Sequence, residues 1–468
     1  MHIIDIVFLI TILTLVSCSI LISKRMNSVL KPCIALTILL ALIQLLSYGF
    51  YWHYLPSYFL ILLMVMMTIF SKNHLSKIKR RLLRFLMVLM LFTSILPWSI
   101  LLPVPELTKP RGDYKVGTRI FRWVDHGRAE KITSDLNDKR NVVLQVWYPS
   151  EENIKGSHSG YLDGLGSLPE KIGPLPKWIF DQYDQINTYG ILDAPISKEQ
   201  EQWPVIIFLT GNGASRAFYT SLIADLASHG YVVLAIDHPY EAMIVKLANG
   251  KIVTTIENHS DARPNLMKFM EDRLHTRIAD VRFVLNQLGN LKASPDNFLL
   301  SLDQNRIFIT GHSLGGASGA VAMACDSRIK AAANIDGTLY GELPKPNGAH
   351  PFLLIESKKE DGDRFLRYQN GNKKLFQQFE GGYRYEIAEA DHYSFTDAPL
   401  LLSFPARFLA SHFQEFGQIP FKTQTMTVDI LNAFFSGAQS NNFTDMDSIA
   451  ERYPGIVRKP INLGNSRP

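Results

Sequence analysis

Cysteine is scarce in this sequence, and its few positions exclude two common kinds of site. Three cysteines occur in 468 residues, at Cys18, Cys33 and Cys325. Their wide spacing provides neither a disulfide framework nor the paired cysteines and histidines of a zinc site. The H-E-x-x-H signature of zinc metalloproteases is also lacking. We therefore expect no disulfide and no bound metal ion.

Basic residues do not outnumber acidic residues over most of the chain. The formal net charge is +5, yet residues 1–110 contain 10 Lys and Arg against 2 Asp and Glu, and residues 111–468 contain 38 against 41. Proteins that bind nucleic acid usually carry clustered Lys and Arg on the domain that makes the contact. We expect no nucleic-acid partner for the larger part of the chain.

The N-terminal region does contain long apolar runs. Residues 3–22, 33–70 and 82–102 are almost continuously hydrophobic, and the second run is long enough for two membrane-spanning helices. An aromatic cluster at residues 51–57, typical of a membrane interface, divides the second run. The sequence therefore predicts an all-α region at residues 1–104 with about four transmembrane helices.

Basic residues between the apolar runs predict the orientation of this region. They lie between the first and second helices and between the third and fourth, whereas the middle loop has none; they are Lys24, Arg25, Lys31, Lys72, Lys77, Lys79, Arg80, Arg81 and Arg84. Because cytoplasmic loops carry the excess of Lys and Arg, both ends of the region should face outward. We therefore predict a multi-pass protein of the cell membrane whose remaining part is extracytoplasmic. A cleaved signal peptide, or a lipoprotein cleavage box at residues 15–18, is disfavoured because no basic segment precedes the first apolar run.

The pattern of the chain changes near residue 110. Prolines mark a linker, which we place at residues 105–113, and residues 114–468 form a second domain. In this domain, strand-like apolar segments alternate along the chain with segments of helical period. This order favours a mostly parallel sheet with helices on both faces. The expected strands are residues 114–124, 141–148, 204–209, 231–236, 306–310, 331–335, 351–355 and 385–388, and the expected helices are 217–228, 264–290 and 426–435. Residues 150–200, rich in Gly, Pro and Ser, should form a long surface excursion.

One stretch in the second domain carries a chemical motif. The strand expected at residues 306–310 passes through Gly311-His312-Ser313-Leu314-Gly315-Gly316 into small, helix-compatible residues. This order of strand, G-x-S-x-G turn and helix is that of a nucleophile elbow, which presents a serine hydroxyl above the edge of the sheet. We therefore predict the α/β-hydrolase fold, with Ser313 as nucleophile.

A serine hydroxyl needs a base and a group that orients this base. In the α/β-hydrolase fold the order along the chain is Ser, then Asp or Glu, then His. His392 is the expected base, because it closely follows the strand at residues 385–388. His350 precedes a strand and His412 falls in an expected helix, so both are disfavoured.

The acid has two candidate positions. Asp336 ends the strand at residues 331–335, directly after the elbow helix, where a carboxylate would reach the crevice beyond the strand ends. The commoner position lies one strand later. The candidates at this second position are Glu356, Asp361 and Asp363, which follow or end the strand at residues 351–355. Position alone leaves these alternatives open.

The tetrahedral intermediate of ester hydrolysis carries a negative oxygen that two N–H donors must stabilise. The N–H of Leu314, directly after the nucleophile, is one candidate. The other is the N–H of Asn212, in the loop Thr210-Gly211-Asn212-Gly213 that follows the strand at residues 204–209. This loop lacks the Gly-Lys-Ser/Thr ending of a nucleotide-binding loop, and we expect no cofactor.

Five short stretches carry a resemblance to a known family. They are Tyr114-Lys115-Val116-Gly117, Val146-Trp147-Tyr148-Pro149-Ser150, Asp225-Leu226-Ala227-Ser228-His229-Gly230-Tyr231, Gly311-His312-Ser313-Leu314-Gly315-Gly316, and His392 with Phe395 after it. Through them, residues from about 110 to 415 resemble the plasma-type (isoform II) platelet-activating-factor acetylhydrolases, serine esterases of the α/β-hydrolase fold.

The resemblance implies roles for particular residues. It implies Ser313 as nucleophile, His392 as base and Asp336 as acid, because this family places its acid on the strand after the elbow. It implies Asn212 and Leu314 as donors of the oxyanion-hole N–H groups. The family's glycine loop often begins with a histidine where this chain has Thr210, but a backbone donor should survive that difference. The family acts on phospholipids with short or oxidised acyl chains at the second glycerol position, without calcium.

These features predict a membrane-anchored serine carboxylic-ester hydrolase that cleaves short or oxidised acyl esters of phospholipids or related lipids. The expected partners are a lipid or small ester substrate and the membrane. One alternative is another serine hydrolase, such as a thioesterase, amidase or peptidase, that uses the same triad. A second alternative is a non-catalytic membrane sensor or transport protein. The sequence does not indicate the oligomeric state.

Overall fold

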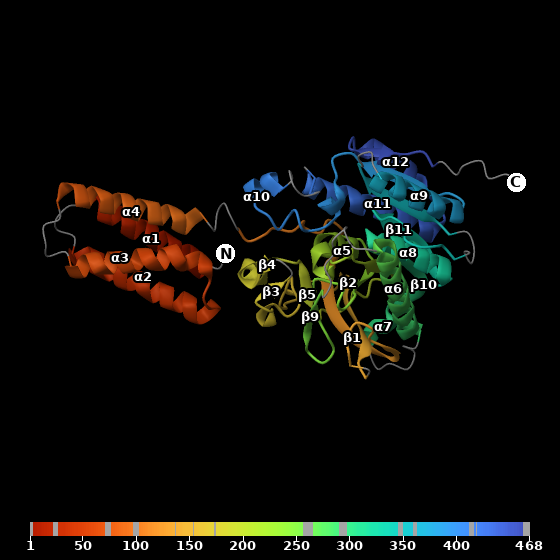
Figure 1. Ribbon diagram of the computed structural model, residues 1–468, viewed down its shortest axis with the longest axis horizontal. Coiled ribbons are helices and arrows are strands. Elements are labelled where there is room, and N and C mark those ends of the chain that lie inside the picture. The colour runs from red at the N-terminus through yellow and green to blue at the C-terminus, as the bar shows by residue number, and fades with distance from the viewer. Residues whose placement is uncertain are drawn as a thin grey trace. The chain divides into compact units, whose positions relative to one another are not determined.

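The chain forms two compact units (Figure 1). The computed structural model describes residues 3–21, 27–70, 76–96, 103–135, 137–152, 154–172, 175–255, 265–289, 297–344, 350–358, 363–410, 416–417 and 419–461. The first unit comprises Met1–Pro105, Pro176–Ile186 and Leu402–Leu409, and the second comprises Glu106–Leu175, Asn187–Leu401 and Ala410–Pro468.

The first unit is mainly a bundle of helices (Figure 1). Its long helices are α1 (Ile3–Leu21), α2 (Asn27–Tyr48), α3 (Leu55–Phe70) and α4 (Lys77–Leu96), and a short 3₁₀ helix, η1 (Trp52–Tyr54), joins α2 to α3. Apolar side chains such as Phe8, Leu60 and Met64 are buried between the helices. The predicted N-terminal helical region is therefore present, and the predicted aromatic break falls at η1.

Not all of these helices meet the requirements for crossing a membrane. Among the described residues, one helix is both long and apolar enough, over Leu30–Ser47 of α2. The apolar stretches Ile3–Ser19 and Trp52–Thr68 are shorter. The predicted orientation depends in part on Lys24, Arg25 and Lys72, which lie outside the described residues.

The second unit is built on a ten-stranded sheet with the order β14-β13-β12-β11-β10-β6-β7-β2-β1-β5. Six neighbouring strands run parallel: β6 (Trp203–Leu209), β7 (Val232–Asp237), β10 (Leu302–His312), β11 (Ile329–Ile335), β12 (Phe352–Ser357) and β13 (Tyr383–Ile387). At one side, β1 (Lys115–Ala129) and β2 (Lys139–Ser150) form an antiparallel pair, and β2 is also antiparallel to β7. The mostly parallel sheet that the sequence predicts is therefore confirmed.

Helices cover both faces of this sheet. One face packs against α6 (Leu266–Gly289), α8 (Leu314–Cys325) and α9 (Asp363–Gln378), and α6 lies beside α8 (Figure 1). The other face packs against α5 (Thr220–Ser228), α11 (Pro420–Ser440) and α12 (Thr444–Arg452). Every residue of β6 and of β7 is buried. Burial on both faces explains why these strands read as apolar runs instead of alternating patterns.

Some short elements were not anticipated from the sequence. Within the predicted excursion at residues 150–200, β5 (Gly190–Leu192) joins the edge of the sheet parallel to β1. At the other edge, β14 (Ile456–Arg458) pairs antiparallel with β13, in a stretch without an expected strand. Each has three residues, too few to show a hydrophobic period. The remaining short elements are β3 (Lys171–Ile172), β4 (Leu175–Pro176), β8 (Ile244–Lys246), β9 (Ile252–Thr254), α7 (Asn297–Leu300) and α10 (Phe404–Ala410).

Candidate active site

Ser313 occupies the sharp turn between β10 and α8. Its backbone angles are φ 56° and ψ −125°, a conformation that residues other than glycine rarely adopt and that costs about 1–3 kcal/mol. The Ser313 N–H donates to the Ile335 carbonyl at 2.8 Å, which holds the turn against β11. The strand, turn and helix of the elbow are therefore all present, and the surrounding structure maintains the strained serine.

Gly315 lets the elbow helix approach β6 closely. A Cβ atom at this position would lie 2.2 Å from the Leu209 carbonyl oxygen and 2.5 Å from that of Thr210. Both obstacles are backbone atoms, so the helix or the strand end would have to move. The glycine is therefore required for the position of the loop that begins at Thr210 relative to the elbow.

We expect Gly315→Ala to destabilise the protein by about 1–3 kcal/mol, as for other overpacked cores. The measurement is the unfolding midpoint of the full chain in detergent, followed by tryptophan fluorescence. Gly289→Ala is the matched control, because a Cβ there would meet no atom within 4 Å. Alanine at that helical position should leave the midpoint unchanged or raise it slightly. Equal midpoints for the two variants would contradict the close approach.

His392 lies between Ser313 and Asp336. Its Nε2 atom is 3.1 Å from Ser313 Oγ, and its Nδ1 atom is 2.7 Å from Asp336 Oδ2. An ionised carboxylate only accepts hydrogen bonds, so Nδ1 carries the proton and donates to Asp336. Nε2 is then the unprotonated nitrogen and accepts from the Ser313 hydroxyl. The structure thus brings the predicted serine, histidine and aspartate into one hydrogen-bonded series.

The neighbouring strand fixes Asp336. The Ser357 N–H donates to Asp336 Oδ1 at 2.8 Å, and the Ser357 hydroxyl lies 3.1 Å from Oδ1 and 3.0 Å from Oδ2. The Asp336 side chain is fully buried, whereas that of His392 is 13% exposed. Ser357 therefore fixes the carboxylate so that Oδ2 can accept from the imidazole, and the imidazole retains some access to the exterior.

Glu356, the alternative acid on β12, has a different partner. Arg384 donates to it from Nε at 2.8 Å and from Nη2 at 3.3 Å. Burial raises the pKa of Glu356, and the Arg384 charge opposes this rise. Successive side chains of a strand point to opposite faces, so Ser357 faces Asp336 while Glu356 faces Arg384. Asp336, and not Glu356, accepts the hydrogen bond from His392 Nδ1.

Of the other candidates from the sequence, two lie in the described part of the chain and two lie outside it. His350 lies two residues before β12, at the end of that strand opposite to Ser357. Asp363 is the first residue of α9. Asp361 and His412 lie outside the described residues.

A second series of hydrogen bonds joins the loop after β6 to His392. The Gly211 N–H donates to Tyr219 Oη at 2.9 Å, and this oxygen is 2.9 Å from His312 Nδ1. His312 Nε2 lies 2.8 Å from the His392 carbonyl oxygen. A carbonyl only accepts, so His312 donates from Nε2 and its Nδ1 accepts the Tyr219 hydroxyl proton. Burial raises the pKa of Tyr219, which keeps this hydroxyl protonated.

The two predicted oxyanion-hole residues belong to segments that adjoin Ser313. Leu314 is the first residue of α8, where N–H groups have no partner within the helix. Asn212 follows Gly211, and a Cβ on Gly211 would lie 3.6 Å from Ser313 Cβ. The Asn212 side chain accepts a hydrogen bond from Arg273 of α6 at 2.7 Å. The loop therefore runs beside Ser313, with the Asn212 side chain held by Arg273 of α6.

Several supporting residues could not be recognised from the sequence. Ser357 and Tyr219 reach the cluster from elements far from it in the chain, and no local pattern encodes such contacts. His312 lies inside the G-x-S-x-G motif, which specifies a turn but leaves this position unrestricted. Its bond to the His392 carbonyl becomes visible only when the two segments are placed in space.

A mostly parallel sheet covered on both faces, with a serine elbow and a nearby His–Asp pair, defines an α/β-hydrolase. Residues 103–451 match the family "Platelet-activating factor acetylhydrolase, isoform II". The chain belongs to this family, as the resemblance in its sequence predicts.

Individual relatives agree with this assignment. The chain is 37% identical over 265 residues to a probable 1-alkyl-2-acetylglycerophosphocholine esterase of Arthroderma benhamiae, which covers 53% of this chain and 62% of the relative. It is 25% identical over 277 residues to the platelet-activating factor acetylhydrolase of Canis lupus familiaris, which covers 52% of this chain and 59% of the relative. The matches thus span about six-tenths of these relatives' lengths.

A solved structure shares the fold. A ferulic acid esterase from Streptomyces cinnamoneus superposes with a TM-score of 0.63 at 24% identity, over 76% of this chain and 100% of that chain. At this identity the similarity establishes the α/β-hydrolase fold and nothing finer.

Proposed function

We propose that this protein is a membrane-anchored serine carboxylic-ester hydrolase. Its nucleophile is Ser313, its general base is His392 and its orienting acid is Asp336. The observation that carries the proposal is the position of His392, with one ring nitrogen 3.1 Å from the serine hydroxyl and the other 2.7 Å from a buried carboxylate. Membership of an acetylhydrolase family supports the same conclusion.

In the proposed reaction, Ser313 Oγ attacks the ester carbonyl carbon while His392 Nε2 takes the hydroxyl proton. Asp336 stabilises the imidazolium that forms, and the N–H groups of Asn212 and Leu314 stabilise the oxyanion. The imidazolium then gives its proton to the departing alcohol oxygen, leaving an acyl ester on Ser313. Water attacks this ester with His392 again as the base. The products are a carboxylic acid, an alcohol and the free enzyme.

The proposed substrate is a phospholipid or related lipid with a short or oxidised acyl chain at the second glycerol position. The names of the relatives support this class, since one is a probable 1-alkyl-2-acetylglycerophosphocholine esterase and another a platelet-activating factor acetylhydrolase. The first name specifies an ester of an acetylated glycerophosphocholine, and the second specifies hydrolysis of an acetyl group. We therefore expect a pocket that admits a short acyl chain and restricts a long one.

The N-terminal helices are proposed to form a multi-pass anchor in the cell membrane, with the second unit outside the cytoplasm. Large apolar side chains are exposed on each of the four long helices described above, for example Ile10 (55%), Leu39 (53%), Phe59 (55%) and Phe85 (65%). Exposed apolar surface of this kind is unfavourable in water and suits contact with lipid. An anchor would keep the esterase unit close to lipid substrates.

The test uses the full chain in membranes and in detergent micelles. We expect hydrolysis of nitrophenyl acetate, faster release of acetyl than of palmitoyl from the second position of phosphatidylcholine, and loss of both activities after treatment with a fluorophosphonate. The chain should stay with the membrane during carbonate extraction. Cleavage of peptides or thioesters without cleavage of esters would favour another serine hydrolase, and ligand binding without turnover would favour a sensor.

A further inference from the structure

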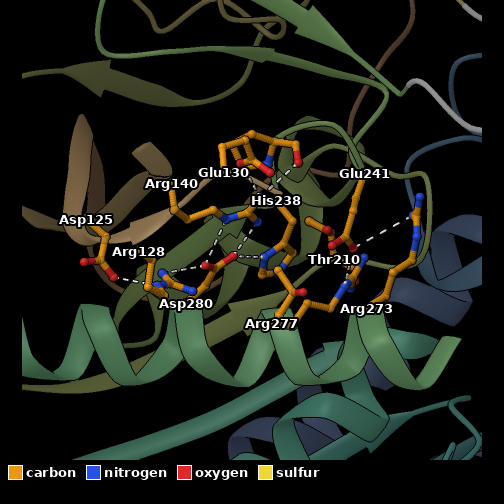
Figure 2. A network of polar contacts seen from close by, with 12 residues as sticks. Asp125, Arg128, Glu130, Arg140, Thr210, His238, Glu241, Arg273, Arg277 and Asp280 are labelled. Carbon is orange, nitrogen blue, oxygen red and sulfur yellow. Dashed lines mark hydrogen bonds and ion pairs between the residues drawn. The ribbon is translucent and has the colours of Figure 1, made fainter. Parts of the chain in front are cut away.

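A buried arginine of α6 binds the backbone of the loop that follows β6. Arg277 of α6 is 0% exposed. Its Nη1 donates to the Thr210 carbonyl, and its Nη2 donates to the Gly211 carbonyl at 3.3 Å. Figure 2 shows Arg277 projecting from the helix toward Thr210 and Glu241. A single guanidinium therefore binds two successive carbonyl groups of the loop.

The direction of these carbonyls determines the direction of the neighbouring N–H groups. In a planar trans peptide, the C=O and the N–H of one unit point in opposite directions. Because the Gly211 carbonyl faces Arg277, the Asn212 N–H of the same peptide points away from α6. The Thr210 carbonyl also faces Arg277, and the Gly211 N–H on its far side donates to Tyr219 Oη at 2.9 Å. Both peptide units therefore have fixed orientations.

Two further charged residues complete this support. Glu241 Oε2 accepts from Arg277 Nε at 3.0 Å and lies 3.9 Å from Arg273 Nη1. Arg273, one turn before Arg277 on α6, donates to Asn212 Oδ1 at 2.7 Å. Glu241 is 5% exposed and Arg273 is 6% exposed. Buried charges are unfavourable unless they are paired. The contacts with Glu241 therefore allow both guanidinium groups to remain in the interior.

We propose that Arg277, held by Glu241, is a positioning residue of the oxyanion hole. It directs the Asn212 N–H toward the place where the negative oxygen develops, so that the hole is formed before substrate binds. This role rests on the proposed ester-hydrolase function, because Arg277 would fix the orientation of the peptide that forms its oxyanion hole. A charged donor on the Gly211 carbonyl also polarises that peptide and strengthens the Asn212 N–H as a donor.

The test is Arg277→Lys in the full chain, assayed in detergent micelles with nitrophenyl acetate. Lysine retains the charge, but its ammonium is a compact point charge that cannot reproduce the fork of donors. We expect kcat to fall about 10- to 100-fold, less than the roughly 10²- to 10³-fold of losing a donor entirely. KM should change less than about threefold, since the donor acts mainly in the transition state.

A second readout distinguishes positioning from general structural damage. A trifluoromethyl ketone adds to the serine as a hemiketal whose oxygen occupies the oxyanion hole. Its affinity should fall by the same factor as kcat/KM, because it resembles the transition state. The affinity of an acetamide analogue that binds without forming an oxyanion should stay the same.

Arg140→Lys is the matched control. Arg140 is 4% exposed and pairs with Asp280 at 2.7 Å and Glu130 at 3.0 Å, away from Thr210 in the same network (Figure 2). Its substitution should lower thermal stability and leave kcat unchanged. If Arg277→Lys does not fold, Glu241→Gln replaces it, with a smaller fall in kcat and an unchanged KM expected.

The outcomes separate the two proposals. If the folded variant matches Arg140→Lys in both kcat and ketone affinity while the parent is active, the positioning role is wrong and the ester-hydrolase function stands. If the parent neither hydrolyses the ester nor binds the ketone, the proposed function is wrong. The positioning role of Arg277 is then wrong as well. A selective loss of kcat and ketone affinity supports both.

Discussion

Ser313→Ala is expected to lower kcat for nitrophenyl acetate by about 10⁴- to 10⁶-fold, because the proposed nucleophile of the acyl-enzyme step is lost. The oxyanion hole and the binding site remain, so a small residual rate above that of water should persist. KM should change little, since the hydroxyl contributes mainly to the reaction itself. The measurement is steady-state hydrolysis by the full chain, together with the stoichiometry of fluorophosphonate labelling.

Ser327→Ala is the control for this substitution. Ser327 is exposed in the turn that follows α8, so its hydroxyl can be removed without affecting the elbow. The control should retain both turnover and labelling. If Ser313→Ala retained them as well, another residue would have to be the nucleophile.

Asp336→Asn is expected to lower kcat by about 10⁴-fold, the scale seen when a triad carboxylate becomes an amide. The amide has nearly the same shape but cannot stabilise the imidazolium. Its NH₂ group can also donate to Nδ1, which would leave the proton on Nε2 and prevent that atom from accepting the serine proton. Ser357 would still donate to the remaining carbonyl oxygen, so the fold should be preserved. Steady-state kinetics and the unfolding midpoint measure the two effects separately.

Glu356→Gln is the matched control for the acid. Glu356 is buried on the adjacent strand, and the sequence alone favoured it nearly as much as Asp336, but its carboxylate binds Arg384. We expect lower stability, because the half-buried Arg384 loses the charge of its buried partner, and a nearly unchanged kcat. The opposite result, with Glu356→Gln inactive and Asp336→Asn active, would show that the acid comes from β12.

The fold was predictable where its elements are long and fully buried. The strands β6, β7 and β11, and the buried second half of β10, read as mostly apolar runs because both faces of the sheet are covered, and α6 has a clear helical period. The edge strands β5 and β14 were missed, since pairing in space and not local composition makes three residues a strand. Membrane crossing by four helices remains a proposal, because only α2 among the described helices is both long and apolar enough.

The geometry of the candidate site was predictable where the proposed chemistry imposes a local pattern or an order along the chain. Ser313 needs flanking glycines, and the histidine must follow a late strand, so both positions could be named in advance. The acid remained open because Asp336 and Glu356 both occur near the ends of strands. What separates them is the direction of each side chain and its partner, Ser357 or Arg384, which a sequence does not reveal.

The supporting shell was not predictable. Arg277 and Arg273 occur one turn apart on α6, a spacing that any amphipathic helix contains. Arg277 donates to the Gly211 carbonyl and Arg273 to the Asn212 side chain, and these partners are some sixty residues away in the chain. Such long-range contacts determine how the backbone donors point, and they leave no mark on local composition.

The most direct measurement is a crystal structure of the full chain after reaction with an organophosphorus ester. We predict phosphorus bonded to Ser313 Oγ, His392 within hydrogen-bond distance of that oxygen, and the phosphoryl oxygen accepting from the N–H groups of Asn212 and Leu314. Phosphorus on any other residue, or a phosphoryl oxygen turned away from these two donors, would contradict the proposed ester-hydrolase site.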